Sequence, residues 1–313
     1  MSANMPVKKS EFLNDCVTVV CLIEAVNSNP NGDPDNENAP RQYSDGRGYI
    51  TPECAKFKIR QAIGQMVENE ELKEEGHHLY CTPQTFSIQS EVEACLGKDV
   101  MKKKNITLDE EIAYRKQLCD YFFDARMFGM VNTAFSSYNT LGKISGALQI
   151  GTAVSCDPVE IVPDTITRCC VTKDDERKSA TKNKDRTMGR RKVVRYGLYR
   201  QFTSTNIAAA RMNNVTNEDV HTLIQAYLRM FDDDMSSARP EMAIRKLYTI
   251  RQSSKGCKLP PYVINDVLVT KLKPGVDSPT CYDDYIVEFK RDMLPDTVEV
   301  MEYDYLHPEG VIL

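Results

Sequence analysis

The chain has 313 residues, of which 41% are hydrophobic and 27% are charged, and its net charge is −5. This composition is typical of a soluble globular protein with one large domain or two ordinary ones. No apolar run approaches the roughly 18 residues of a membrane span, and the N-terminus lacks the apolar segment of a secretory signal. The eleven cysteines are an odd number without a C-x-x-C pair, which favours thiols in a reducing cytoplasm over a disulfide framework.

In the first half of the chain the pattern predicts one strand and two helices. Residues 16–26 are apolar and β-branched, which is typical of a strand. Thr51 and Pro52 form an N-cap followed by proline, and they begin a helix over residues 53–69 that buries Ile59, Ile63 and Met66. Residues 69–105 are polar and are expected to be irregular. The capping box from Thr107 to Glu110 begins a second helix, which is expected to run through Phe123.

The second half contains more strand-like runs, at residues 146–154, 160–171, 193–203, 285–289 and 298–306. Between them, Thr216 caps the clearest helix of the chain, with apolar residues repeating on one face from Val220 to Phe231. Strands and helices are mixed but do not alternate strictly, as a doubly wound parallel sheet would require. The sequence therefore predicts an α+β fold, with helices packed on one face of an antiparallel sheet.

Charge is distributed very unevenly along the chain. Residues 168–200 contain twelve Lys and Arg against four acids, whereas residues 277–313 contain ten acids against two basic residues. The basic segment predicts a site for a polyanion. An acidic region on the same chain as a basic arm also invites head-to-tail self-association, which forms open filaments when the ring does not close.

The stretch NSNPNGDPDNENAP, residues 27–40, comes close to a calcium-binding EF-hand loop. Gly32 is in register, but the first and last ligand positions hold Asn27 and Asn38, and the last should be a bidentate glutamate. The preceding segment is also a strand and not a helix. We favour a rigid loop shaped by Asx turns and prolines, with calcium as the less favoured alternative.

Catalytic motifs are not found in the sequence. It contains no G-x-S-x-G, Walker A or G-x-G-x-x-G pattern, and His77, His78 and Cys81 lack a second pair of zinc ligands. The acidic run at residues 232–234 ends a predicted helix and favours a solvated turn over a metal site. We expect a protein that is not an enzyme and has no metal or cofactor. The alternative is a metal-dependent nuclease that processes RNA.

The run RTMGRRKVVRYGLYR, residues 186–200, interleaves basic residues with tyrosines. This combination suits single-stranded nucleic acid, because cations meet phosphates while aromatic rings meet bases. A solvent-facing basic loop is the plainer interpretation. The aromatic RNP box of the common RNA-recognition sheet is missing, so base stacking on the sheet face is not supported.

Five motifs in order over about residues 16–290 carry a resemblance to a known family. They are NPNGDPDNENAPR, DARMFG, GALQIGTAVSCDPVEIVPDTITR, RTMGRRKVVRYGLYR and MFDDDMSSARPEMAIRKLY. Together they resemble the backbone subunit of type I CRISPR surveillance complexes (Cascade), in the type I-C (Dvulg) branch of the Cas-seven family and the RAMP superfamily. The family usually has DVR where this chain has Asp124-Ala125-Arg126, a difference that changes no charge.

The resemblance implies a single RRM-like (ferredoxin-like) palm over residues 1–313 with two large insertions. The insertion at about residues 35–125 would form the fingers and web, and the one at about residues 171–195 would form a basic thumb. It also implies a cytoplasmic, non-catalytic subunit for antiviral defence that polymerises head-to-tail along CRISPR RNA in a helical filament. Its partners would be the guide RNA (crRNA), target DNA held through the guide, neighbouring copies, and the large, small and guide-processing Cascade subunits.

The predicted RNA-binding residues lie in the matched motifs and in the helix that begins at residue 52. They are Asn29, Arg41, Lys56, Lys58, Arg60, Arg126, Gln149, Arg168, Arg186, Met188, Arg190, Arg191, Lys192, Arg195 and Tyr199. A sequence-specific regulator of RNA or DNA is a further alternative, which would bind a defined site and would not coat RNA by length.

Overall fold

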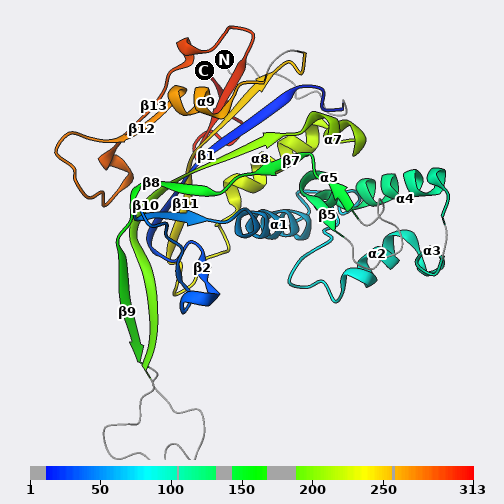
Figure 1. Cartoon of the computed structure of the whole chain (residues 1–313), viewed down its shortest axis with the longest axis horizontal. Coiled ribbons are helices and arrows are strands. Elements are labelled where there is room, and N and C mark those ends of the chain that lie inside the picture. Colours follow the sequence, from blue (N-terminus) through cyan, green and yellow to red (C-terminus); the bar gives the residue numbers. More distant parts are fainter. Residues whose placement is uncertain (1–11, 104–105, 132–142, 168–187, 256–257) are drawn as a thin grey trace, which may run out of the picture.

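An antiparallel sheet forms the centre of the molecule (Figure 1). The computed structural model describes residues 12–103, 106–131, 143–167, 188–255 and 258–313. Within these residues the sheet has nine strands. In spatial order they are β15 (Val311–Ile312), β14 (Glu299–Tyr303), β11 (Glu241–Gln252), β1 (Cys16–Ser28), β10 (Met188–Thr205), β8 (Ala153–Pro158) and β4 (Arg47–Ile50), while β7 (Leu148–Ile150) and β9 (Ile161–Thr167) also pair with β10.

Strand β1 lies at the middle of the sheet, between β10 and β11. Its side chains alternate between two hydrophobic cores, with Val19 and Cys21 in one and Val20 and Leu22 in the other. Successive side chains of a strand point to opposite faces, so a strand covered on both faces needs apolar residues at nearly every position. This explains the continuous apolar run that predicted the strand.

Two long helices cover one face of the sheet. Helix α1 (Pro52–Glu68) and helix α8 (Asn217–Arg229) contribute Ile59, Ile63 and Leu223 to the first core. Each begins where the sequence predicted, because Thr51 and Thr216 accept hydrogen bonds from backbone N–H groups of the first turn. The short helix α7 (Ile207–Met212) lies between β10 and α8.

The opposite face is covered by the C-terminal part of the chain. Helix α9 (Pro261–Val267) and the hairpin of β12 (Leu268–Leu272) and β13 (Tyr285–Phe289) pack there, in the second core. The 3-10 turns η3 (Tyr282–Asp284) and η4 (Arg291–Met293) flank β13. The predicted α+β class with an antiparallel sheet is confirmed. The expectation that all helices pack on one face of the sheet was wrong, because α9 packs on the other face.

A helical lobe extends from the sheet (Figure 1). It contains α2 (Ile88–Leu96), α3 (Lys98–Met101), α4 (Leu108–Tyr121), α5 (Phe123–Phe128) and the small hairpin of β5 (Gly129–Val131) and β6 (Lys143–Ser145). The capping box at Thr107 is confirmed. The expectation that residues 69–105 are irregular was wrong for α2 and α3. The box that begins α2 pairs Ser87 with Ser90, so it lacks the glutamate or glutamine that marks a capping box in sequence.

A two-stranded ribbon projects from the sheet in a different direction, towards the bottom of Figure 1. It pairs β9 with the first residues of β10, from Met188 opposite Thr167 to Val194 opposite Ile161. The predicted basic arm joins these two strands, and its residues 171–187 lie outside the described residues. Among the helices that the structure describes, none has the length and apolar character needed to cross a membrane.

Candidate nucleic-acid interface

The asparagine-rich loop after β1 is held by its own amide and carboxylate groups. It contains β2 (Gly32–Asp33), the 3-10 turn η1 (Pro34–Asn36) and β3 (Ala39–Pro40). Asn29 Nδ2 donates to the backbone oxygen of Asn38 at 2.7 Å, and Asn31 Oδ1 accepts from the backbone N–H of Thr51 at 2.9 Å. These bonds fix the loop against the N-terminus of α1, and the expected Asx turn is present at Asp33.

Arg41 follows directly on this loop and lies beside two tyrosines. A hydrogen bond with Tyr49 raises the pKa of Arg41, which also pairs with Asp33 at 3.3 Å. The ring of Tyr43 stacks on that of Tyr49, with centroids 4.3 Å apart, and Tyr43 is exposed. An exposed ring next to a guanidinium is suited to stacking an unpaired base. Neither tyrosine is among the residues predicted to bind RNA, although the R-x-Y spacing from Arg41 to Tyr43 was a usable signal.

The base of the ribbon contributes four predicted cations. Arg190 is exposed and has no carboxylate within 4 Å among the described residues. Arg191 pairs with Asp164 at 2.6 Å and donates to the backbone oxygen of Ser237. The remaining two ion pairs are Lys192 with Glu37 at 3.3 Å and Arg195 with Glu160 at 3.5 Å.

These ribbon contacts draw three distant segments together. Lys192 connects the ribbon to the loop at Glu37, and Arg191 connects it to the turn before β11 at Ser237. The loop meets the same turn, because the backbone N–H of Asn29 donates to Ala238 at 2.7 Å. The structure therefore gathers the loop, the turn at residues 234–239 and the ribbon base at one place beside the start of α1. We call this place the ribbon-base surface.

The cations of α1 differ in how far they are buried. Lys58 is buried and pairs with Asp234, which also accepts from Arg239 at 3.0 Å, a cation absent from the predicted set. Lys56 is half-buried and has no ion partner among the described residues. Burial lowers the pKa of Lys56, and the nearby charge of Arg60 lowers it further. A bound anion would relieve both effects.

Arg60 lies further along α1 and faces the helical lobe. Its Nε donates to Asp124 at 2.6 Å, and its guanidinium lies over the ring of Phe128. Arg126 is buried and pairs with Asp219, also at 2.6 Å. Both arginines thus join elements of the fold to each other.

The structure does not bring the other predicted residues to the ribbon-base surface. Tyr199 is fully buried in the first core, and Gln149 is exposed on β7, where it donates to the backbone of Gly146 at 3.2 Å. Arg168 and Arg186 lie outside the described residues, as does the side chain of Met188.

A metal site is not formed by the part of the chain that the structure describes. No three His, Cys, Asp or Glu side chains there are grouped as ligands. Asp232 and Asp233, from the acidic run after α8, are exposed, while Asp234 accepts from Lys58 and Arg239.

Comparison with known proteins gives one family match and weaker likenesses to many solved structures, of which two are described here. Residues 16–290 match the family model described as CRISPR-associated protein Cas7. A solved structure described as "CRISPR RNA-guided surveillance complex, pre-nicking" has 13% identity and a TM-score of 0.45, covering 78% of this chain and 80% of that one. A second, "CRISPR RNA-guided surveillance complex", has 12% identity and a TM-score of 0.41, covering 78% and 72%.

The search of curated proteins found no match. At their TM-scores the two structural likenesses add no weight to the family match, which spans most of the sequence and all five of the motifs quoted above. The chain belongs to the CRISPR-associated protein Cas7 family.

Proposed function

We propose that this chain is a non-catalytic, guide-RNA-binding backbone subunit of a type I-C CRISPR surveillance complex. Copies of it follow one another head-to-tail along the guide, and the guide in turn pairs with target DNA. The observation that carries the proposal is the convergence of three segments at the ribbon-base surface. Cations that are far apart in the sequence meet there beside an exposed tyrosine stack.

The charge arrangement suits a ligand that is itself a polyanion. Two cations, Lys56 and Arg190, have no carboxylate partner among the described residues, and the Arg195–Glu160 and Lys192–Glu37 pairs are largely exposed to solvent. Exposed ion pairs contribute little to stability and are screened by salt. A chain of phosphates can therefore replace the carboxylates at small cost, and binding should weaken steeply as salt rises.

The far edge of the sheet supports self-association. Its last strand, β15, is short and exposed, and Tyr305 and Leu306 beside it are exposed as well. This edge lies within the acidic C-terminal region, and the ribbon strands β9 and β10, with the cations Arg190 to Arg195, lie on the opposite side of β1 in the strand order. One copy can thus present acids and an open edge to the basic side of the next.

The decisive experiment is to express the chain together with a CRISPR array and to purify what it binds. We expect a large particle with several copies on RNA of uniform guide length, which would be measured by absorbance ratio, particle mass and sequencing of the RNA. Guide RNA should be protected in proportion to the protein added, with no turnover and no effect of EDTA.

Three results would contradict the proposal. Cleavage of RNA that stops with EDTA would favour the metal-dependent nuclease. Binding at one defined sequence, with no dependence on RNA length, would favour a regulator. Particles that form equally well without RNA would remove the guide as the element that orders the copies.

A further inference from the structure

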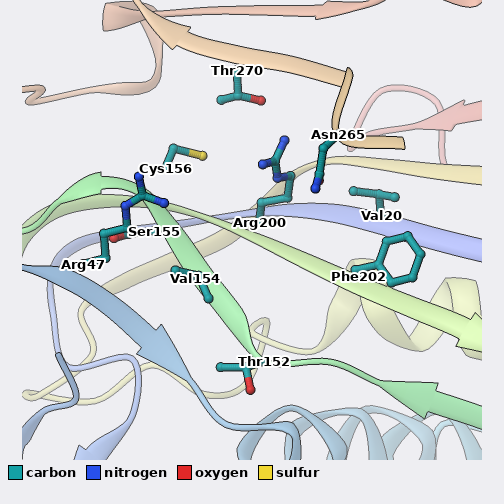
Figure 2. A pocket seen from close by; sticks show the side chains of 10 residues that line it. All are labelled: Val20, Arg47, Thr152, Val154, Ser155, Cys156, Arg200, Phe202, Asn265 and Thr270. Carbon is teal, nitrogen blue, oxygen red and sulfur yellow. The ribbon is translucent and has the colours of Figure 1, made fainter. Parts of the chain in front are cut away.

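A cavity of about 230 Å³ lies between the sheet and the C-terminal layer that covers it. Residues of β4, β8, β10, α9 and β12 line it (Figure 2). Among its lining residues are Arg47, Arg200, Asn265, Thr270, Ser155 and Cys156. The lining contains two cations and several neutral polar groups but no carboxylate.

Arg200 is a half-buried cation in the lining that has no anionic partner among the described residues. Its side chain is half-buried, and its Nη1 donates to the backbone oxygen of Leu268 at 3.2 Å. Among the described residues, no carboxylate lies within 4 Å of it. A partly buried guanidinium has five N–H donors, and here one acceptor among the described residues, so it retains most of its capacity to bind an anion.

Arg47 approaches the same space from β4. Figure 2 shows its guanidinium and that of Arg200 turned into the cavity from different strands. Its own ion pair with Asp45 is long, at 3.7 Å, and exposed. An exposed pair of this kind contributes little, so Arg47 is available to a ligand in the cavity.

Neutral donors complete the lining. The Oγ1 of Thr270 is buried without a hydrogen-bond partner, which costs free energy unless a ligand or water fills the space beside it. Asn265 directs its side chain into the same space in Figure 2. Both groups can donate to an oxyanion while the two arginines supply the charge.

The cysteine in the lining does not serve as the missing anion. Burial raises the pKa of Cys156 to about 11, although the charge of Arg200 opposes the shift. The thiol is therefore neutral near pH 7. The nearby carboxylate of Asp157 is hydrogen-bonded to Tyr285, so it is also engaged elsewhere.

We propose that this cavity binds a phosphoryl group, held by Arg47 and Arg200 and completed by donors from Asn265 and Thr270. Guanidinium groups bond pairs of oxygens bidentately, which favours an oxyanion over a halide. Two guanidiniums and two neutral donors suit the greater charge and the larger number of oxygens of a phosphoryl group better than a single carboxylate. The volume exceeds that of several water molecules, at about 30 Å³ each, and so leaves room for the substituent of a phosphate ester. The ester can be a free nucleotide or a phosphodiester of a nucleic-acid strand.

The test is binding of three probes to the purified full chain by calorimetry: inorganic phosphate, adenosine 5′-monophosphate and a short single-stranded oligonucleotide. We expect saturable binding of the monophosphate that weakens by about tenfold in Arg200→Gln, because a charge-assisted bond is lost. Thr270→Val should weaken it less. The matched control is Arg211→Gln on α7, an exposed arginine bonded to Ser254, which should leave binding unchanged.

A competition experiment shows whether the phosphoryl group belongs to a free nucleotide or to a nucleic-acid strand. If the oligonucleotide displaces the monophosphate, and does so equally well in an Arg190→Ala background, the cavity takes a phosphodiester. If it does not displace it, the cavity takes a free ester. The proposal fails if neither inorganic phosphate nor the monophosphate binds saturably, because the oligonucleotide can also bind at the ribbon-base surface. It also fails if well-folded Arg200→Gln and Thr270→Val both bind the monophosphate as the unmodified chain does. Should Arg200→Gln not fold, Arg47→Gln replaces it with the same expectation.

Discussion

Two groups of cations that were predicted to bind RNA lie in opposite surroundings in the structure. Arg126 and Lys58 lie inside the fold, and their partners Asp219 and Asp234 are as buried as they are. Arg190 and Arg195 lie at the base of the ribbon, where one has no described carboxylate partner and the other shares an exposed pair with Glu160. From the sequence alone, both groups were predicted to bind RNA.

This difference in burial indicates which cations can exchange a carboxylate partner for a phosphate. A buried pair has lost its hydration, so removing one member leaves an uncompensated charge in a poorly polarisable interior. An exposed pair keeps most of its hydration, and its members can turn to another anion. We therefore expect the buried group to act through stability and the ribbon group to act through affinity for RNA.

The largest effect should come from Arg126→Met. Arg126 bonds Asp219 at 2.6 Å and also donates to the backbone oxygen of Cys119. Its loss leaves Asp219 buried without its ion partner and with the capping hydrogen bond from the backbone N–H of Thr216, so the free energy of unfolding should fall by about 3 kcal/mol. Urea denaturation of the full chain measures this. Arg195→Met is the matched control and should change stability little; a large loss of RNA affinity in Arg126→Met with unchanged stability would overturn the comparison.

Arg190→Ala should reduce affinity for RNA and not stability. Stability should stay unchanged, while affinity for single-stranded RNA should fall by about tenfold at low salt, or about 1.4 kcal/mol, for every sequence tested. The slope of log K against log salt should decrease by roughly one, which is the signature of one lost phosphate contact. Arg191→Ala should weaken binding about equally. A loss confined to certain sequences would argue against a phosphate contact, and Arg211→Ala serves as the control.

The half-buried ion pair between Lys246 and Asp304 should contribute to stability by an amount between these limits, and that contribution should depend on pH. Burial alone would raise the pKa of Asp304, but hydrogen bonds from Lys246 and His307 outweigh it and lower that pKa to about 2. Because the folded-state pKa lies below the unfolded value near 3.9, this carboxylate stabilises the fold above pH 4. The contribution is lost as pH falls from 4 towards 2.

The measurement is the urea stability of the unmodified chain and of Asp304→Asn from pH 6 to pH 3. The difference between them should shrink by about 1 kcal/mol over this range. A difference that does not depend on pH would show that Asp304 acts through packing and not through its charge.

Much of the fold follows from local patterns, and much of the site does not. Thr51, Thr107 and Thr216 cap helices through contacts three residues away, so the sequence displays them directly. The burial of Arg126 depends on Asp219, 93 residues further on, and no local pattern reveals that pairing. Tyr199 is buried because of the register of β10 beside β1 and β8, since moving by one residue turns a side chain to the other face.

The smallest effect, and the sharpest test of the comparison, should come from removing an acid instead of a cation. In Glu160→Gln the exposed partner of Arg195 loses its charge, and exposed pairs contribute less than about 1 kcal/mol, so stability should hardly change. Affinity for RNA should rise severalfold at low salt and return to that of the unmodified chain at high salt, because one repulsive charge beside the phosphates is gone. The matched control is Glu288→Gln on β13, an exposed glutamate away from the ribbon. If Glu160→Gln destabilises the chain without raising RNA affinity, Arg195 belongs with the structural cations and the division between the two groups does not follow exposure.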